Sequence, residues 1–333
     1  MTFLRFGHIT VDTKIGDVID HPAFQRKGNL LFPWNDRRQN HPEQTMRYAP
    51  RLHLWHSHMD PQQMVDGVNR LIDDVGEGKQ VLYDIYSREE KARDPEKWNT
   101  VLFFFRGNPG APFGIICPGG GYYYVGSLHT GFPVAMELNK HGYNAFVLNY
   151  RVGDYIPGEY KCNEDLIRAA HFILAHAEEL EVCPEDYAIG GECAGARITS
   201  NVCYGEAGVK RPEELLHPVA AIIAYVFFEG HPDFQPDDPA AYFIIGGRDH
   251  LVRQRDVTDR YEEMKRAGIP AVCSVFPTAP HGFGLGIGTE AEGWIDNAVS
   301  FWEQHMKNKD HIQRKAEVPI RPRVSGKIVK EGM

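Results

Sequence analysis

The sequence lacks any apolar run long enough to cross a bilayer, which takes about 20 residues. Its first residues, MTFLRFGHITVDTKIGD, also lack the long apolar core of a signal peptide. There is no excess of positive charge: the formal net charge is −9, whereas a protein that binds a phosphate backbone needs a basic face. We therefore expect neither a membrane nor a nucleic acid as a partner.

Cysteines are also few, and none stands in a C-x-x-C pair. The chain has six, spread from Cys117 to Cys273, which argues against a zinc ribbon or a redox motif and favours reduced thiols in the cytoplasm. Histidines are more numerous, and His53, His56 and His58 lie close to Asp60. Their spacing matches no helical H-x-x-x-H pair, so we expect no metal and no cofactor.

The chain divides into three parts. Residues 1–79 form an N-terminal extension with one clear helix, which begins after Asp60 with Pro61 at its first position and ends at Gly76. Gln63 stands at the position of a capping-box partner. We expect the extension to be a lid over a site, a strap on the main domain or a contact in a homodimer. Residues 309–333 are charged and contain prolines, which indicates an extended arm.

Residues 80–308 alternate between short apolar runs and amphipathic stretches. The expected strands cover residues 81–87, 101–107, 113–121, 143–151, 187–191, 219–226, 241–247 and 271–277, and the expected helices cover 133–142, 163–180, 254–268 and 291–306. The first two strands, joined by a turn-rich link, should enter antiparallel. Strands that are apolar on both faces and separated by helices predict an α/β domain with a mostly parallel sheet of about eight strands flanked by helices.

A parallel sheet places its reactive residues at the carboxyl ends of its strands, and the first candidate is Cys193. It lies in GGECAGA, where Gly191 and Gly195 allow a tight turn from a strand into a helix. The pattern is G-x-S-x-G with cysteine in place of serine. The helix N-terminus favours an anion and thus a thiolate. The alternative is a buried small residue in a glycine-rich turn.

Two further strand ends supply an acid and a base. Asp249 follows the apolar strand AYFIIGG, and a carboxylate there can orient a histidine; its ordinary role would be to cap the next helix. His281 follows the last strand in FPTAPHGFGLG and has the best context of the 16 histidines for a general base. The chain order nucleophile, acid, base favours a catalytic interpretation of all three.

An acyl-transfer site also needs donors for the oxyanion. The loop CPGGGYYYVG follows a strand, and its Gly120 and Gly121 could turn their amides inward, with the amide of Ala194 completing the pocket. A phosphate-binding loop is the competing explanation. It is disfavoured because the loop has neither the Lys-Ser/Thr ending of a P-loop nor the G-x-G-x-x-G spacing.

These residues resemble the α/β-hydrolase superfamily, and the likeness is greatest to the acetyl-esterase and hormone-sensitive-lipase-like carboxylesterases. Residues 118–121 (PGGG) match the family's His-Gly-Gly-Gly oxyanion loop, with Pro118 in place of the histidine. Residues 191–195 match the Gly-x-Ser-Ala-Gly elbow, and residues 248–249 and 281–283 match the acid and base segments. The resemblance covers roughly residues 80–308.

The resemblance implies a carboxylic ester hydrolase that acts through a Cys193–His281–Asp249 triad and an acyl-enzyme, on a small-molecule ester with an acetyl-like group. Dienelactone hydrolases and some acyltransferases of the superfamily use such a cysteine, so a lactone hydrolase and an acyltransferase are alternatives. A non-catalytic ligand-binding protein on the same scaffold is a third. The sequence does not distinguish an evolved cysteine from one that stands in for serine.

Several residues near these loops are weaker candidates for substrate contacts. They lie after the oxyanion loop, beside Cys193 and after the strand at 219–226: Tyr122, Tyr123, Glu192, Phe227, Phe228 and Glu229. Each also has an ordinary structural interpretation, as a core aromatic or a helix cap.

Overall fold

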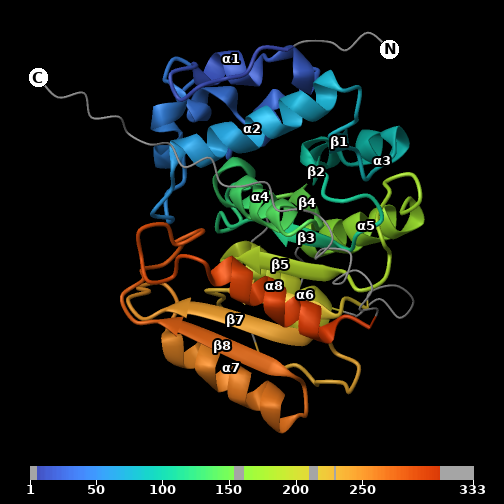
Figure 1. Ribbon diagram of the computed structural model, residues 1–333, viewed down its shortest axis with the longest axis vertical. Helices are drawn as coiled ribbons and strands as arrows, with labels where there is room; N and C mark the ends of the chain where they lie inside the picture. Colours follow the sequence, from blue (N-terminus) through green and yellow to red (C-terminus); the bar gives the residue numbers. More distant parts are fainter. Residues whose placement is uncertain (1–5, 154–160, 210–216, 229, 308–333) are drawn as a thin grey trace, which may run out of the picture.

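The computed structural model describes residues 6–153, 161–209, 217–228 and 230–307 (Figure 1). The predicted C-terminal arm, residues 309–333, lies outside this part of the chain, as does Glu229.

A single eight-stranded sheet organises the described residues. Its strands are β1 (Leu82–Tyr83), β2 (Val101–Phe105), β3 (Phe113–Cys117), β4 (Asn144–Asn149), β5 (Ala188–Glu192), β6 (Ala220–Ala224), β7 (Ala240–Gly246) and β8 (Ala271–Phe276). They follow the order β1-β2-β4-β3-β5-β6-β7-β8. In Figure 1 the sheet runs from β1, near the N-terminal helices, to β8 at the opposite edge.

The pairing directions agree with the expected mostly parallel sheet. β2 pairs antiparallel with both β1 and β4, and every later pairing is parallel. The predicted antiparallel entry is therefore confirmed. The carboxyl ends of β3, β5, β7 and β8 consequently open onto one edge of the sheet.

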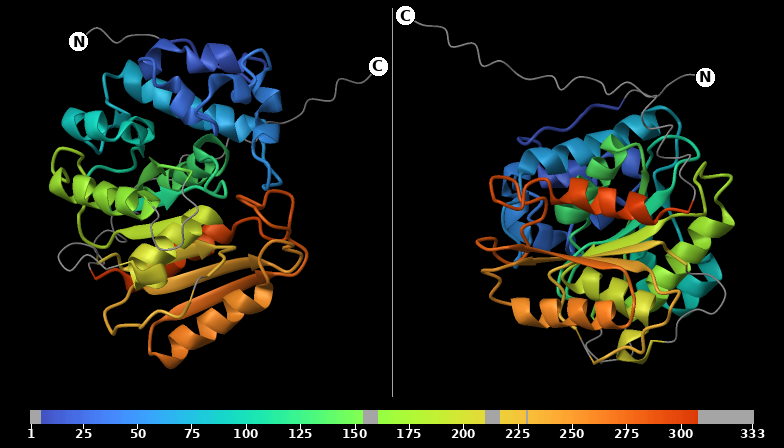
Figure 2. Two further views of the ribbon diagram at one scale, coloured as in Figure 1. Left: turned by 180° about the vertical axis from the view of Figure 1, so that it is seen from behind. Right: turned by 60° about the horizontal axis from the view of Figure 1, so that its bottom comes forward.

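Helices cover both faces of the sheet. The α-helices of the described residues are α1 (Ile15–Ile19), α2 (Pro61–Gly76), α3 (Arg88–Arg93), α4 (Phe132–Lys140), α5 (Lys161–Ala175), α6 (Ala194–Tyr204), α7 (Gln254–Arg266) and α8 (Trp294–His305), and not all of them contact the sheet. In Figure 2, α2, α4 and α8 lie over one face, and α5, α6 and α7 lie over the other. In the part of the chain that is described, every helix is too short or too polar to span a bilayer.

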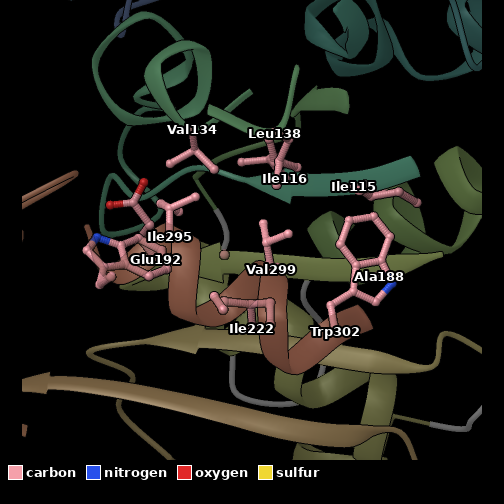
Figure 3. Close-up of a pocket in the computed structure, with 15 residues that line it drawn as sticks. Ile115, Ile116, Val134, Leu138, Ala188, Glu192, Ile222, Ile295, Val299 and Trp302 are labelled. Atoms are coloured by element: carbon pink, nitrogen blue, oxygen red, sulfur yellow. The ribbon is translucent and has the colours of Figure 1, made fainter. Parts of the chain in front are cut away.

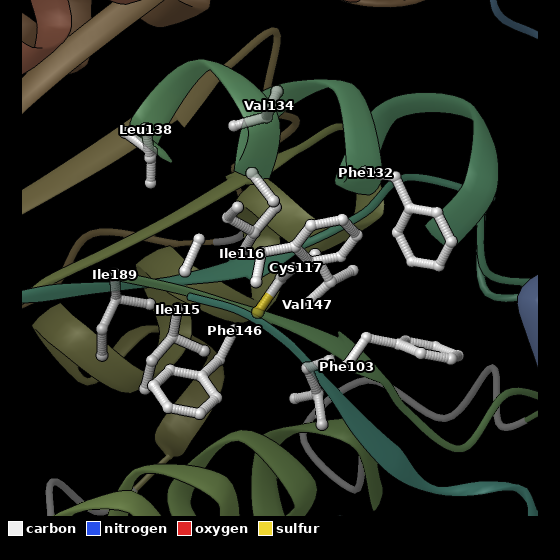
Figure 4. Packing of buried hydrophobic residues seen from close by; sticks show 14 of the residues in the cluster. Phe103, Ile115, Ile116, Cys117, Phe132, Val134, Leu138, Phe146, Val147 and Ile189 are labelled. Carbon is white, nitrogen blue, oxygen red and sulfur yellow. The ribbon is translucent and has the colours of Figure 1, made fainter. Parts of the chain in front are cut away.

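Both faces of the central strands are packed with apolar side chains, because helices cover each face. Figure 4 shows this packing around β3 and β4. The Phe104 and Phe146 rings stack 4.3 Å apart on adjacent strands, and Phe132 of α4 contacts Phe103 edge to face. Cys117 ends β3 inside this core, and burial raises the pKa of its thiol to about 12. Core packing therefore holds the end of β3 firmly in place.

Two local details differ from the prediction. The link between β1 and β2 contains α3, whose Ser87 and Glu90 form a capping box, rather than turns alone. At the start of α2, Asp60 accepts a hydrogen bond from the amide of Gln62, and Gln63 does not complete a capping box. The predicted packing of α2 on the main domain is observed, because Gly67 lies directly against Phe132 of α4.

Candidate active site

Cys193 lies at the tip of the turn between β5 and α6. Its φ of +52° and ψ of −115° fall in a region that a residue with a side chain rarely adopts. A Cβ on Gly191 would lie 2.4 Å from the Gly195 carbonyl, and one on Gly195 would lie 1.9 Å from the Cys117 carbonyl oxygen. Both glycines are thus required by close backbone approach, which explains the spacing of the motif.

Asp249 and His281 meet across the loops that follow β7 and β8. The Nδ1 atom of His281 donates to Oδ2 of Asp249 over 2.7 Å, and neither side chain has exposed surface. The other carboxylate oxygen, Oδ1, accepts the amides of Leu251 and Val252, each at 2.8 Å. The carboxylate is therefore fixed by the backbone on one side and orients the imidazole with the other.

Glycines at the end of β7 bring these two loops together. A Cβ on Gly246 would lie 2.2 Å from the carbonyl oxygen of Ala279, so only a bare backbone fits there. The amide of Arg248 also donates to the Ala279 carbonyl over 3.1 Å. The acid and base segments are thus joined by backbone contacts as well as by their side chains.

His281 also interacts with Cys193. Burial lowers the pKa of His281, but the hydrogen bond to Asp249 and the interaction with the Cys193 thiol outweigh burial and raise the pKa to about 9. Within the described residues, the buried Nε2 atom has no partner that meets strict hydrogen-bond geometry. Asp249 thus holds the imidazole through Nδ1, and in the part of the chain that is described Nε2 is the ring nitrogen left without a hydrogen bond.

The predicted oxyanion loop follows β3 and lies beside the elbow. Gly120 and Gly121 have φ values of +148° and +61°, in the region that favours glycine. Among the described residues, no backbone carbonyl accepts the amides of Gly120, Gly121 or Ala194. The hydroxyl of Tyr122 donates to the carbonyl of Ala194 over 3.4 Å, which joins the loop to the start of α6.

The predicted substrate contacts have different surroundings. Tyr123 is 56% exposed, whereas Tyr122 is buried. The carboxylate of Glu192 accepts the hydroxyl of Tyr225, and burial raises its pKa above the usual value. The ring of Phe228 lies against the Arg260 guanidinium, 4.2 Å from ring centroid to Cζ. Tyr123 and Phe227, the latter 54% exposed, offer substantial surface to a ligand, whereas Glu192 and Phe228 are engaged within the protein.

Glu192 also borders an apolar cavity of about 50 Å³ between the sheet and helices α4 and α8 (Figure 3). Its walls include Ile116, Val134, Ile295 and Val299, and Cys193, Asp249 and His281 do not line it. Successive strand residues point to opposite faces, so Glu192 faces the cavity while Cys193 begins the turn. The cavity is therefore separate from the candidate triad.

The N-terminal extension contributes to the site in a way that the sequence did not reveal. His53 and His56 pack ring against ring, with centroids 3.7 Å apart, and His56 is 5.9 Å from the His281 ring. His58 is exposed, so the three histidines near Asp60 do not converge. Among the described residues, no group of three or more His, Cys, Asp or Glu side chains has the arrangement of a metal site.

Comparisons with known proteins found relatives of hydrolase and esterase type. Residues 130–286 match the dienelactone hydrolase family. An acetylxylan esterase from Xylanibacter ruminicola is 27% identical over 215 residues, which cover 56% of this chain and 44% of the relative. This chain thus spans less than half the length of that relative.

Solved structures of esterase type resemble the fold. An acetyl ester-xyloside bifunctional hydrolase from Caldicellulosiruptor lactoaceticus is 19% identical, covering 67% of this chain and 95% of its own, with a TM-score of 0.56. MGS-M1, an α/β hydrolase from a Medee basin deep-sea metagenome library, is 22% identical, covering 62% of this chain and 92% of its own, with a TM-score of 0.53. Thermogutta terrifontis esterase 2 is 21% identical, covering 63% of this chain and 90% of its own, with a TM-score of 0.52.

The sheet order, the covering helices and these matches define an α/β-hydrolase fold. The segment that matches the dienelactone hydrolase family, residues 130–286, contains Cys193, Asp249 and His281. The resemblance inferred from the motifs alone is confirmed at the level of the fold.

Proposed function

We propose that this esterase-like chain hydrolyses carboxylic esters of small acyl groups, with Cys193 as nucleophile, His281 as general base and Asp249 as its orienting residue. One observation carries the proposal. The 2.7 Å hydrogen bond between the buried side chains of His281 and Asp249 lies beside a cysteine held at φ +52° in a strand-to-helix turn. A buried ion pair and a strained turn each cost free energy, so their combination favours a catalytic role over a structural one.

The proposed chemistry proceeds through a thioester. Cys193 gives its proton to His281, and the thiolate sulfur bonds to the ester carbonyl carbon. The amides of Gly120, Gly121 and Ala194 are the proposed donors to the oxyanion that forms. The carbon–oxygen bond then breaks, and the leaving alkoxide takes the proton from His281. Water, deprotonated by His281, attacks the thioester, releasing the carboxylic acid and returning the proton to the sulfur.

We propose an acetyl ester of a sugar as the substrate. The relative named acetylxylan esterase supports this class, and so does the exposed ring of Tyr123, whose centroid is 5.7 Å from that of Trp55. Trp55 in turn lies against Gly121 of the oxyanion loop. Aromatic faces at this place suit the apolar face of a sugar ring held as the leaving alcohol.

The test is a panel of p-nitrophenyl esters from acetate to octanoate, with acetylated xylose, assayed on the wild type, Cys193→Ala and Cys193→Ser. We expect the acetyl esters to be the best substrates and Cys193→Ala to remove turnover. If Cys193→Ser turns over esters faster than the wild type, Cys193 stands where the site is built for a serine. If it is slower, the thiol is the native nucleophile. No turnover of any ester, with Cys193 alkylated no faster than a free thiol, would contradict the proposal and favour a binding protein.

A lactone is the second candidate substrate. The match of residues 130–286 to the dienelactone hydrolase family, with a cysteine at the elbow, favours it specifically. Adding an unsaturated lactone to the panel separates the two, since a lactone hydrolase would open that ring with a higher kcat/KM than it shows for acetyl esters. Adding an alcohol acceptor and measuring acyl products would distinguish hydrolysis from acyl transfer.

A further inference from the structure

One short stretch of the N-terminal extension, residues 53–57, contacts both loops of the candidate site. At one end, the amide of Ser57 donates to the carbonyl of Gly282 over 2.9 Å, and the Ser57 hydroxyl approaches the His281 carbonyl at 3.4 Å. These contacts join residues more than 220 positions apart in the sequence. The loop that carries His281 is therefore attached to the extension by its own backbone.

The other end of this stretch is attached to the loop that follows the oxyanion glycines. The hydroxyl of Tyr124 accepts the amide of Leu54 at 2.7 Å and lies 3.0 Å from Nδ1 of His53. Trp55 stacks on the Tyr124 ring, with centroids 5.6 Å apart and an interplanar angle of 5°. The Trp55 ring also lies directly against Gly121. Residues 53–55 thus hold the oxyanion loop, and Ser57 holds the loop that carries His281.

Between these attachments, the ring of His56 fills the gap between the two loops. A Cβ on Gly119 would lie 2.8 Å from Cε1 and Nε2 of His56, and one on Gly282 would lie 2.7 Å from Cγ of the same ring. The φ angle of Gly119 is outside the left-handed region, so its backbone would accept a side chain. What excludes a side chain there is occupied space, chiefly the ring of His56.

His56 acts in this gap as a neutral ring. Burial lowers its pKa well below the usual value, and the nearby His281 lowers it further. Within the described residues, neither ring nitrogen has a hydrogen-bond partner, and neither is exposed to solvent. Among the described residues, no ion pair or hydrogen bond holds the His56 ring in this gap. Its position is set by how the ring packs against the two loops.

We propose that His56 is a positioning residue that sets the separation of the oxyanion loop and His281, so that the site is incomplete without residues 53–57. This inference rests on the proposed function, since it assigns His56 to the same reaction. It makes the extension part of the site wall. Removing the ring would let the two loops approach each other and would weaken the contact between His281 and Cys193.

The test compares His56→Ala with His58→Asn, a matched control on the same segment. His58 is exposed and has φ +58°, a conformation that asparagine tolerates. We expect His56→Ala to lower kcat on p-nitrophenyl acetate by roughly 10- to 100-fold with little change in KM, and His58→Asn to match the wild type. The pH profile of Cys193 alkylation by iodoacetamide should also shift in His56→Ala, because that profile reports the His281 contact. A general loss of stability would not move it.

A second pair of variants tests the inference from the side of Gly119, and its single variant Gly119→Ala keeps the His56 ring, so wild-type activity in that variant would contradict the inference even if His56→Ala does not fold. In Gly119→Ala the new methyl group meets the His56 ring, so activity should fall. In Gly119→Ala/His56→Ala the methyl group fills part of the vacated space, and activity should exceed that of Gly119→Ala. If the activity loss of the double variant equals the product of the losses of the two single variants, Gly119 and His56 are not coupled and the inference is wrong.

The failure of this inference can be distinguished from failure of the proposed function. If the wild type hydrolyses esters but His56→Ala keeps the wild-type kcat and alkylation profile, the inference is wrong and the proposed function stands. If the wild type hydrolyses no ester, the proposed function fails, and the alkylation profiles still show whether His56 controls the contact between Cys193 and His281.

Discussion

Asp249 holds His281 through one carboxylate oxygen while two backbone amides hold the other, so the pair forms a fixed unit at the ends of β7 and β8. Because both side chains are fully buried, the charge of Asp249 acts on the imidazole with little screening by solvent. The unit therefore determines both the orientation of the ring and its affinity for a proton.

The first prediction concerns the orientation. Asp249→Asn keeps the size of the side chain but removes the charge, and its amide group can present a donor to Nδ1, which favours the wrong tautomer. We expect kcat on p-nitrophenyl acetate to fall by about 10³- to 10⁴-fold, as in other triads. Asp256→Asn, in the first turn of α7 and paired with Arg253 outside the candidate site, should remain within about twofold of the wild type. Equal losses in the two variants would argue against an orienting role for Asp249.

The second prediction is a pH dependence of stability. The folded state raises the pKa of His281 from about 6.5 to about 9, so it binds this proton more tightly than the unfolded chain does. The resulting stabilisation is present below about pH 6.5 and is lost as the pH rises through about 9, a change of roughly 3 kcal/mol. Urea unfolding at pH 6, 7.5 and 9 measures it. Asp249→Asn should flatten this slope, and a parallel slope in that variant would contradict the assignment to His281.

The third prediction concerns the elbow. Gly195→Ala places a methyl group 1.9 Å from the Cys117 carbonyl oxygen, and the buried backbone of β3 has no room to yield. We expect a destabilisation of more than about 2 kcal/mol, in the upper range of overpacking, together with loss of Cys193 reactivity. Gly7→Ala is the control, since a Cβ there meets nothing within 4 Å. Thermal unfolding of both variants measures the difference, and similar melting temperatures would show that the elbow tolerates a side chain.

The sequence predicted the meeting of Cys193, Asp249 and His281 for a topological reason. Each follows an apolar strand, and the ends of parallel strands gather at one edge of the sheet, so strand order alone brings them near one another. Gly191 and Gly195 strengthened the prediction because two small residues around one reactive residue suit a tight turn. The sequence could not indicate which carboxylate oxygen of Asp249 faces His281, because the amides of Leu251 and Val252 that hold the other oxygen belong to no recognisable pattern.

The role of His56 could not be predicted in the same way. Residues 53–58 have neither helical nor strand periodicity, and their partners lie in loops far along the chain, as in the Ser57–Gly282 contact. No local pattern encodes a contact of that kind. Helix α3 was different: Ser87 and Glu90 are a readable capping signal for a short helix.

The fourth prediction concerns Glu192. Burial raises the pKa of its carboxyl, and hydrogen bonds from Tyr225 and Thr130 offset this only in part. Because the pKa of Glu192 is higher in the folded protein than in the unfolded chain, where it is near 4.5, the free energy of unfolding falls as the pH rises from 4.5 through the folded-state pKa. Glu192→Gln can still accept the Tyr225 hydroxyl but carries no charge, so we expect a higher melting temperature than the wild type at pH 7.5. The gain should disappear near pH 4, and a variant that is less stable at both pH values would show that the charge is compensated.

The last prediction concerns the thiols. Cys193 and Cys273 are both partly buried, but burial alone raises the pKa of Cys273 to about 11, whereas Cys193 interacts with His281. With limiting iodoacetamide at pH 7.5, we expect peptide mapping to find the label on Cys193 well before Cys273, and Cys117 to stay unmodified until the chain unfolds. His281→Ala should slow the labelling of Cys193 about tenfold or more and leave Cys273 unchanged, because only a thiol with a basic partner forms thiolate readily. Equal labelling of Cys193 and Cys273 in the wild type would mean that His281 does not activate this thiol.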